Sequence, residues 1–181
     1  TNWTNIDASA NFSTDCNLAP VVVIPDVNMK AALIADSFIN SNGDSEIQVS
    51  EAAAITQTLT GEGLGISDLT GIEAFVNITG LNVRNNNLTN IDLSQNTKIT
   101  FLNVEENNLT SIDLSNNTAL SWLSVGKNQI SNIAVSTLVN LEEFYLFENQ
   151  IATLDVSSNV LLKRIWANQN ELTSIDLSNN V

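Results

Sequence analysis

Apolar and polar positions alternate along the C-terminal part of the chain in a pattern that recurs every 21 residues. Segments that begin at residues 78, 99, 120, 141 and 162 fit one template without insertion, L-x-x-L-x-V-x-x-N-x-L-x-x-I-D-L-S-x-N. A unit this short cannot bury its own apolar stripe, so the pattern predicts that the units stack on one another. The apolar positions of the first unit are Ile78, Leu81, Val83, Leu88, Ile91 and Leu93.

A column of asparagines, at positions 86, 107, 128, 149 and 170, follows the short strand expected in each unit. An inward amide at such a turn can satisfy backbone groups that the turn leaves unpaired. The pattern is that of a leucine-rich repeat, and we predict an α/β-solenoid, mostly β and right-handed, with 21-residue repeats. The I-D-L-S segment should form a second extended stretch on the convex side. Its aspartates would form a column interrupted by Ala134, and Asp caps turns more often than it binds calcium. They are Asp92, Asp113, Asp155 and Asp176.

Side chains alternate along a strand, so positions 80, 82 and 84 and their equivalents should face outward on the concave sheet. Several of these positions carry aromatic residues with charged neighbours, which is typical of interface hot spots. Such rings can also stack on sugars. The alternative is that they only cover the sheet and stabilise cross-strand pairs, by roughly 0.2–1 kcal/mol each. The candidate ligand-binding residues are Phe101, Trp122, Tyr145, Phe147, Arg164 and Trp166.

Two helices are predicted before the regular repeats, one within residues 24–39, where Asp26 can cap the first turn, and one that covers residues 50–58. Residues 20–56 should thus form a small helix-loop-helix cap that protects the N-terminal end of the core. An irregular zeroth repeat, residues 57–77, follows the cap. Its apolar residues should continue the buried stripe, and they are Leu59, Leu64, Ile66, Leu69 and Ile72.

The two expected helices flank N-S-N-G-D-S-E-I-Q-V-S-E, residues 40–51, whose spacing matches the calcium loop of an EF-hand. Two departures weaken the match, because Asn40 replaces the first Asp and Ser45 replaces the usual glycine. The loop is either a calcium site or a vestigial connection between two helices, and no other cofactor is expected. The candidate metal ligands are Asn40, Asn42, Asp44, the carbonyl of Glu46, Gln48 and Glu51.

The chain of 181 residues carries 20 acidic against 6 basic residues, a net charge of −14. Such a surface repels phosphate backbones, so we expect no nucleic acid partner. No apolar run approaches the length of a membrane span. Histidine is absent, which removes the commonest general base and zinc ligand. Because nothing assembles a nucleophile, a base and an orienting group, we expect that the chain is not an enzyme.

Three motifs stand in order before the repeats: I-P-D-V-N-M-K-A-A-L, N-S-N-G-D-S-E-I-Q-V-S-E-A and L-G-I-S-D-L-T-G-I-E-A-F. Together with repeats that end in D-L-S-x-N, they resemble secreted Bacteroidetes-type leucine-rich repeat proteins of internalin-like architecture with an EF-hand-like N-terminal cap. The resemblance covers residues 20–181. It implies a large multidomain protein, extracellular or on a bacterial cell surface, often exported by the type IX system. It also implies a role in adhesion or protein binding.

The first 19 residues resemble the C-terminal cap segment that closes a repeat array in the same family, where a cysteine near the end pairs with one upstream. That resemblance implies that Cys16, the only cysteine, has its partner before residue 1. It also implies that the chain is a monomeric fragment of a longer protein. A free thiol at Cys16 is the alternative. The expected segments are therefore a tail (1–19), a cap (20–56) and the repeats (57–181).

These patterns favour a recognition module that binds a protein or a polysaccharide through its concave sheet, within a larger adhesin. Two other functions stay open. The chain could be a structural spacer in a long surface protein, with calcium stiffening its cap, or an accessory domain of a secreted enzyme. Nothing in the sequence identifies the ligand.

Overall fold

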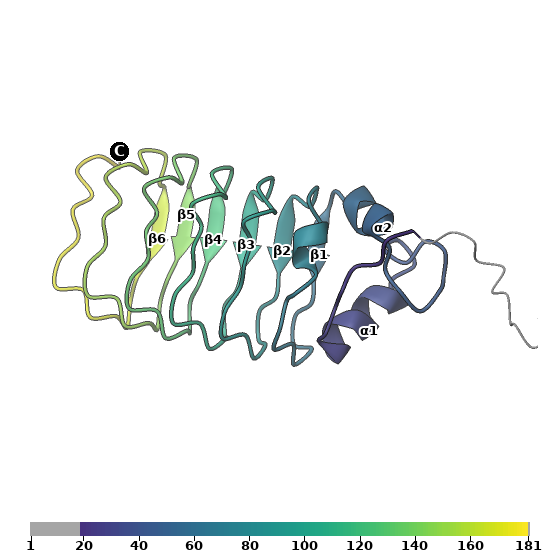
Figure 1. Ribbon diagram of the computed structural model, residues 1–181. Coiled ribbons are helices and arrows are strands. Elements are labelled where there is room, and N and C mark those ends of the chain that lie inside the picture. Colours follow the sequence, from purple (N-terminus) through teal and green to yellow (C-terminus); the bar gives the residue numbers. More distant parts are fainter. Residues whose placement is uncertain (1–18, 181) are drawn as a thin grey trace, which may run out of the picture.

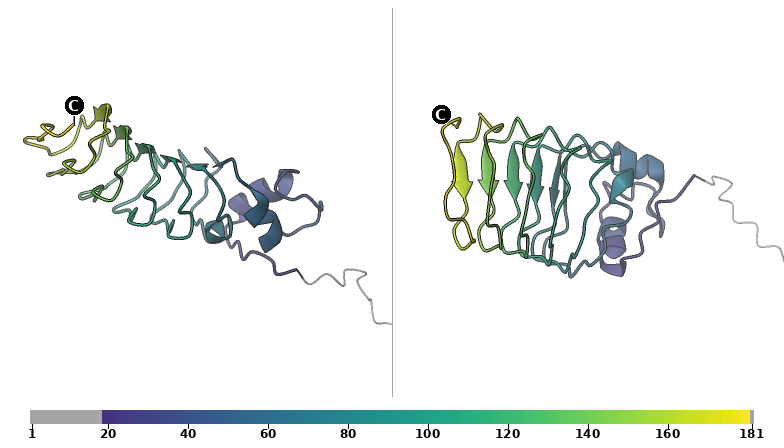
Figure 2. Two further views of the ribbon diagram at one scale, coloured as in Figure 1. Left: turned by 90° about the horizontal axis from the view of Figure 1, so that it is seen from above. Right: turned by 60° about the vertical axis from the view of Figure 1, so that its left-hand side comes forward.

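The computed structural model describes residues 19–180, which form a leucine-rich repeat solenoid as the sequence predicted (Figure 1). Six short strands lie side by side in one parallel sheet, in the order of the sequence. The strands line one edge of the array, and the connecting loops form the other edge (Figure 2). The strands are β1 (Thr58–Thr60), β2 (Gly80–Asn82), β3 (Phe101–Asn103), β4 (Trp122–Ser124), β5 (Glu143–Tyr145) and β6 (Arg164–Trp166).

A column of apolar residues at the strand centres sets the register of the sheet. Leu81 lies opposite Leu102, which lies opposite Leu123, and the column continues through Phe144 to Ile165. Since side chains alternate along a strand, the residues on either side of this column point away from the core. The 21-residue spacing of the sequence therefore becomes the spacing of the strands, and the outward positions of neighbouring turns become neighbours in space.

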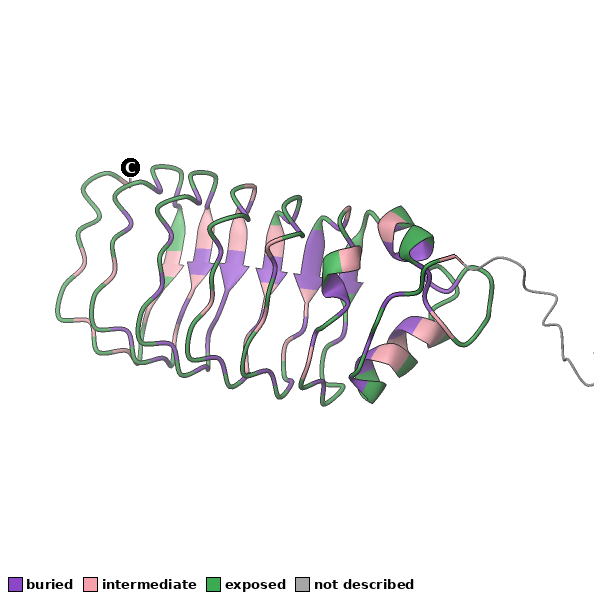
Figure 3. Cartoon of the chain, viewed as in Figure 1, coloured by how far each residue is buried: buried purple, intermediate pink, exposed green. Residues whose placement is uncertain are grey.

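A single buried core runs through the solenoid from the cap to the last turn (Figure 3). It begins at Val22, includes Met29 and Leu33 of the cap, and ends at Leu162. In the first four regular turns five of the six apolar columns are buried, and only the column of Ile91 is half-buried in most turns. In the last turn, core residues such as Ile165 are half-buried, because no further turn of the described residues packs against them.

The asparagine column that follows the strands points inward and binds the backbone of its own turn and of its neighbours. Asn107 donates through Nδ2 to the carbonyl oxygens of Val83 (3.0 Å) and Val104 (3.1 Å). Its Oδ1 accepts a hydrogen bond from the N–H of Leu88 at 3.0 Å. The structural role predicted for this column is therefore confirmed. Equivalent contacts are made by Asn86, Asn128, Asn149 and Asn170.

A second asparagine ladder links the turns on the side away from the sheet. Asn117 is fully buried, and its Nδ2 donates to the carbonyl oxygens of Leu93 (3.0 Å) and Asn96 (3.1 Å) in the preceding turn. The sequence template contains this position, but its role was not predicted. Leu138 takes the place of the asparagine in the next turn. The same kind of contact is made by Asn96, Asn159 and Asn180.

The aspartate column lies exposed on the surface of these turns and caps them. Each carboxylate accepts a hydrogen bond at 2.9 Å from the N–H of the serine two residues later, as Asp113 does from Ser115. Hydrogen bonds from these serines hold the pKa of each aspartate below its usual value. The column therefore consists of turn caps. Among the described residues the convex segments form no strand. Each turn is linked to the one before by a backbone hydrogen bond, such as that from the N–H of Asn108 to the carbonyl oxygen of Leu88 (2.8 Å).

The N-terminal cap contains helices α1 (Val27–Ala35) and α2 (Val49–Ala54), and the 3-10 helix η1 (Ile72–Ala74) follows β1. Asp26 caps α1 as predicted, because its Oδ1 accepts hydrogen bonds at 3.0 Å from the N–H groups of Asn28 and Met29. None of the helices within residues 19–180 is long and apolar enough to cross a membrane.

Two details predicted for this region are wrong. The second helix ends at Ala54, not at residue 58, because Thr58 already belongs to β1, which pairs with β2. Leu64 is 41% exposed instead of lying in the buried stripe. It stands between Gly63 and Gly65, whose positive φ angles (69° and 72°) form a turn that carries it outward. The expected tail of residues 1–19, with Cys16, lies almost wholly outside the described residues.

Candidate functional site

Four aromatic side chains form a continuous row across β3 to β6, and we call Phe101, Trp122, Tyr145 and Trp166 the aromatic row. The ring centroids of Phe101 and Trp122 are 4.5 Å apart and their planes make an angle of 19°, so these rings are stacked. Trp122 and Tyr145 follow at 5.2 Å and 39°. Tyr145 and Trp166 meet edge to face at 5.3 Å and 74°. The row thus spans four strands of the outward side of the sheet, here called the strand face.

The rings of the row differ in exposure. Trp166 is 58% exposed, whereas the other three rings are half-buried by their neighbours. Phe101 and Trp122 each cover one face of the other ring, and Trp122 also contacts Tyr145 on its other neighbouring strand. Trp166, which lies across Tyr145, is therefore the most accessible ring of the row.

Phe147 is also a candidate ligand-binding residue, but it lies apart from the row and covers the neighbouring turn. A Cβ added to Gly126 would lie 2.6 Å from Cε1 of the Phe147 ring. Gly126 is buried under this ring although it occupies an outward position. Ser124 is also outward and fully buried, and its hydroxyl donates to the carboxylate of Glu105. Phe147 therefore shields backbone on the strand face and has one side occupied.

Charged side chains flank the row at β5 and β6. Nη1 of Arg164 lies 3.0 Å from Oε1 of Glu143, and the Tyr145 hydroxyl donates to the other carboxylate oxygen. The hydrogen bond from Tyr145 lowers the pKa of Glu143, and the same bond raises the pKa of Tyr145. These contacts hold Tyr145 in place between Trp122 and Trp166. Arg164, the last of the candidate ligand-binding residues, keeps an exposed side chain.

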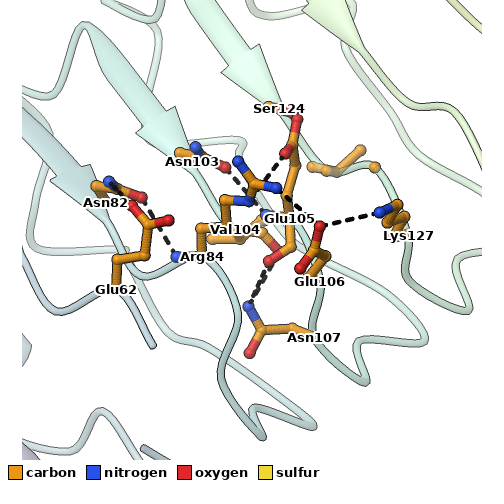
Figure 4. Close-up of polar contacts among 12 residues, drawn as sticks. Glu62, Asn82, Arg84, Asn103, Val104, Glu105, Glu106, Asn107, Ser124 and Lys127 are labelled. Atoms are coloured by element: carbon orange, nitrogen blue, oxygen red, sulfur yellow. Dashed lines mark hydrogen bonds and ion pairs between the residues drawn. The ribbon is translucent and has the colours of Figure 1, made fainter. Parts of the chain in front are cut away.

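A second charged cluster lies on the strand face near β2 to β4 (Figure 4). Arg84 extends between two carboxylates, with Nη2 2.8 Å from Oε1 of Glu106 and Nε 3.4 Å from Oε2 of Glu105. Nζ of Lys127 lies 3.0 Å from the same oxygen of Glu106. The hydrogen bond to Glu106 raises the pKa of Arg84, and the bonds from Arg84 and Lys127 lower the pKa of Glu106. The cluster was not predicted, although separations of 21 and 22 residues indicate neighbouring turns.

Among residues 19–180, opposite charges are paired on the strand face and in the cap, and none of these ion pairs involves the convex aspartate column. The chain has 6 Lys and Arg residues. Four of them are at the strand face and form ion pairs with glutamates of neighbouring turns. The exposed aspartate column of the convex turns makes no ion pair with any residue in the range 19–180. The four cations are Arg84, Lys127, Lys163 and Arg164.

The structure brings together only part of the candidate metal ligands in the cap loop. Asn40 is buried, and its Nδ2 donates to the carbonyl oxygens of Ile34 (3.1 Å) and Asp44 (2.8 Å). At Glu46 the candidate ligand is the backbone carbonyl, and the side-chain carboxylate pairs with Lys30, whose Nζ lies 2.7 Å away. Within residues 19–180, no group of three or more His, Cys, Asp or Glu side chains is arranged to hold a metal ion. The loop interior is formed by Asn42, Asp44, Gln48 and Glu51.

No protein-family model and no curated protein matches the chain. Among solved structures, it is similar to the functional domain of InlJ from Listeria monocytogenes, with a TM-score of 0.55 and 26% identity, over 90% of this chain and 46% of that one. An internalin (inlF) of the same species matches with a TM-score of 0.75 and 25% identity, over 87% of this chain and 47% of that one. A leucine-rich repeat protein of Leptospira interrogans matches with a TM-score of 0.55 and 26% identity, over 57% of this chain and 28% of that one.

The fold is therefore internalin-like. This chain spans less than half the length of each of these structures, so it corresponds to one part of them.

Proposed function

We propose that this chain is a non-enzymatic recognition module that binds a protein ligand on its strand face. The aromatic row carries the proposal, because it places four rings in contact across neighbouring strands and ends in a tryptophan that is 58% exposed. Aromatic residues are enriched in the centres of protein interfaces, where a few of them supply most of the binding energy. A rigid row of rings loses little side-chain entropy when a partner covers it.

The charge distribution supports the same face. The ion pairs beside the row, such as Arg164 with Glu143, leave little net charge on the strand face. The aspartate column of the convex side forms no ion pair with any of the described residues. A partner that covers an unpaired charge removes it from water, which costs free energy. This cost is offset only if the partner supplies an opposite charge. A partner therefore loses less by covering the strand face than by covering the convex turns.

The arrangement of the rings favours a protein over a polysaccharide. Stacking on a sugar requires a ring face that is open to solvent. Phe101 and Trp122 are stacked on each other, and Tyr145 lies between two other rings. Trp166 is the most accessible ring of the row. A single accessible ring is a small stacking surface for an extended glycan. Ring edges and the mixed polar rim suit the irregular surface of a protein.

The internalin-like fold supports a wider context for this binding. We propose that the chain belongs to a larger adhesin that is extracellular or on the surface of a bacterium, with no nucleic acid partner. The two similar structures from Listeria monocytogenes are each more than twice as long as the part that this chain matches. This difference in length supports a place for the chain within a multidomain protein.

The test is a comparison of strand-face and control variants in binding. The immobilised chain is used to capture proteins from solubilised cell surfaces, and a captured protein is then identified, purified and titrated. We expect Trp166→Ala to weaken its affinity by about 10-fold to 100-fold. Val160→Ala, which removes an exposed apolar side chain from a turn outside the strand face, should leave the affinity unchanged.

Other outcomes contradict the proposal in distinct ways. A purified partner that binds Trp166→Ala as tightly as wild type would place the interface elsewhere. Binding to a glycan array that depends on Trp166 would replace the protein ligand with a polysaccharide. Absence of both kinds of binding would favour the structural spacer.

A further inference from the structure

The loop of residues 40–51 has the spacing of a calcium site, but the carboxylates of Asp44 and Glu51, its strongest candidate ligands, already accept hydrogen bonds within the chain. A calcium ion in an EF-hand takes about six to eight oxygen ligands, and the last glutamate of the loop supplies two of them. In this loop that position is Glu51, a residue that is 8% exposed. The question is therefore what the carboxylate of Glu51 binds.

Both oxygens of Glu51 accept hydrogen bonds from the loop itself. Oε1 accepts from the N–H of Ser41 (2.8 Å), the hydroxyl of Ser41 (2.9 Å) and the N–H of Asn42 (3.1 Å). Oε2 accepts a hydrogen bond from the N–H of Gln48 at 3.0 Å. Gln48 is the residue that precedes α2 and caps its N-terminus. One carboxylate thus joins the start of the loop to its end, which is the role that the cation has in an EF-hand.

The second carboxylate of the loop is occupied in the same way. Oδ1 of Asp44 accepts from the N–H of Glu46 at 2.7 Å. Its Oδ2 accepts from Nδ2 of Asn42 (3.0 Å) and Nε2 of Gln48 (2.9 Å). The amides of Asn42 and Gln48 therefore direct N–H donors, which repel a cation, toward the centre of the loop. The residues present do not fit calcium.

We propose that the Glu51 carboxylate closes the 40–51 loop in place of a cation, so that the N-terminal cap folds without calcium. Four donors on one buried carboxylate satisfy both of its oxygens, so Glu51 needs no further ligand. The loop also pairs with the segment before α1, through Val22 N–H to Ile47 O (2.8 Å) and Val49 N–H to Pro20 O (2.8 Å). Closure by Glu51 therefore also holds that segment against the end of the solenoid.

The experiment is thermal unfolding of the 181-residue chain in EDTA and in millimolar calcium chloride, with calorimetric titration of calcium into the EDTA-treated and desalted protein. We expect the same unfolding midpoint in both solutions. The titration should show no heat of calcium binding, which excludes a site with a dissociation constant in the micromolar to millimolar range. Glu51→Gln should lower the midpoint by roughly 5–10 °C in both, because the amide NH₂ faces donors where the carboxylate accepted bonds. The matched control, Glu46→Gln, removes the same charge from the same loop and should have a smaller effect.

Two results would overturn the proposal. One is stoichiometric calcium binding with a rise of the wild-type midpoint that disappears in Glu51→Gln. The other is a Glu51→Gln variant that unfolds at the wild-type midpoint. If Glu51→Gln does not fold, the wild-type comparison in EDTA and calcium still decides whether the cap needs the ion.

Discussion

The ring of Phe147 lies directly over the backbone of Gly126 in the preceding turn, closer than a Cβ at Gly126 would allow. In the other turns this outward column carries side chains, among them Arg84 and Glu105. At this point of the strand face, the large side chain of Phe147 therefore depends on a small residue in the turn before it.

Gly126→Ala should destabilise the protein by about 1–2 kcal/mol, because the new Cβ must displace the Phe147 ring. In a Phe147→Ala background the same substitution should be close to neutral, since the ring is gone and alanine restricts the unfolded chain more than glycine does. Urea unfolding of the wild type, both single variants and the double variant measures this coupling. Additive effects would show that the two residues do not interact.

The buried amide of Asn117 leads to a second prediction. Asn117→Asp places a charge in a fully buried site that faces two carbonyl oxygens, and it should cost about 3–5 kcal/mol. Asn117→Leu should cost only about 1–2 kcal/mol, because Leu138 occupies the equivalent position of the next turn and the solenoid accommodates it there. Denaturant unfolding of both variants at neutral pH makes the comparison, and equal losses of stability would contradict it.

The residue before each inward asparagine adopts a left-handed backbone conformation. At Glu148 φ is 53°, and the equivalent residue of the first regular repeat is Asn85, with φ of 55°. Asparagine tolerates this region better than glutamate. Glu148→Asn should therefore stabilise the protein by about 0.5–1 kcal/mol. Glu171→Asn removes the same charge at an exposed residue without a positive φ, and it serves as the control. A gain of equal size at both positions would point to charge and not to the backbone.

Stability should fall in acid because of Asp26, which joins α1 to the zeroth repeat. Its Oδ2 accepts from the N–H (2.8 Å) and the hydroxyl (3.0 Å) of Ser67. Burial raises the pKa of Asp26, but hydrogen bonds from Ser67, Met29 and Asn28 lower it further, so the folded-state pKa lies below the ordinary value. The carboxylate therefore contributes fully above its unfolded pKa of about 4, and this contribution is lost as the pH falls through the lower folded pKa.

Asp26→Asn should cost roughly 1–3 kcal/mol at neutral pH, since the amide keeps only one acceptor oxygen. The difference from wild type should shrink below about pH 4, where the wild-type carboxylate also becomes protonated. Thermal unfolding of both proteins across this range is the measurement. A difference that stays constant down to the lowest pH would exclude the carboxylate as its cause.

Most of the architecture follows from the repeat. The period of 21 residues correctly predicted the inward strand centres, such as Leu102, and the structural role of the asparagine at position 107. Predictions were wrong where the period is broken. The apolar character of Leu64 predicts a core residue, but Leu64 is exposed in an irregular turn between two glycines with positive φ angles. The helix predicted over residues 50–58 is too long at its C-terminal end, because Thr58 pairs with Gly80 of β2 as part of β1.

The sequence predicts which residues lie on the strand face, but it does not predict how their side chains contact one another. The outward columns of the repeat predict that Trp122, Tyr145 and Trp166 lie on adjacent strands. How the rings meet depends on side-chain torsions, which the sequence pattern does not contain. The function of the site stays a proposal that the binding experiment tests.

By itself, the sequence determined which side chains face the core and which face solvent, because every turn repeats the same backbone path and the same alternation of strand residues. Only the tertiary structure decided which neighbours each outward side chain contacts. Phe147 covers Gly126, Arg84 bridges to Glu106, and Glu51 turns toward Ser41 because these contacts join residues of different turns or distant ends of a loop. Their geometry depends on the local shape and charge of both partners, and a periodic pattern along the chain describes neither.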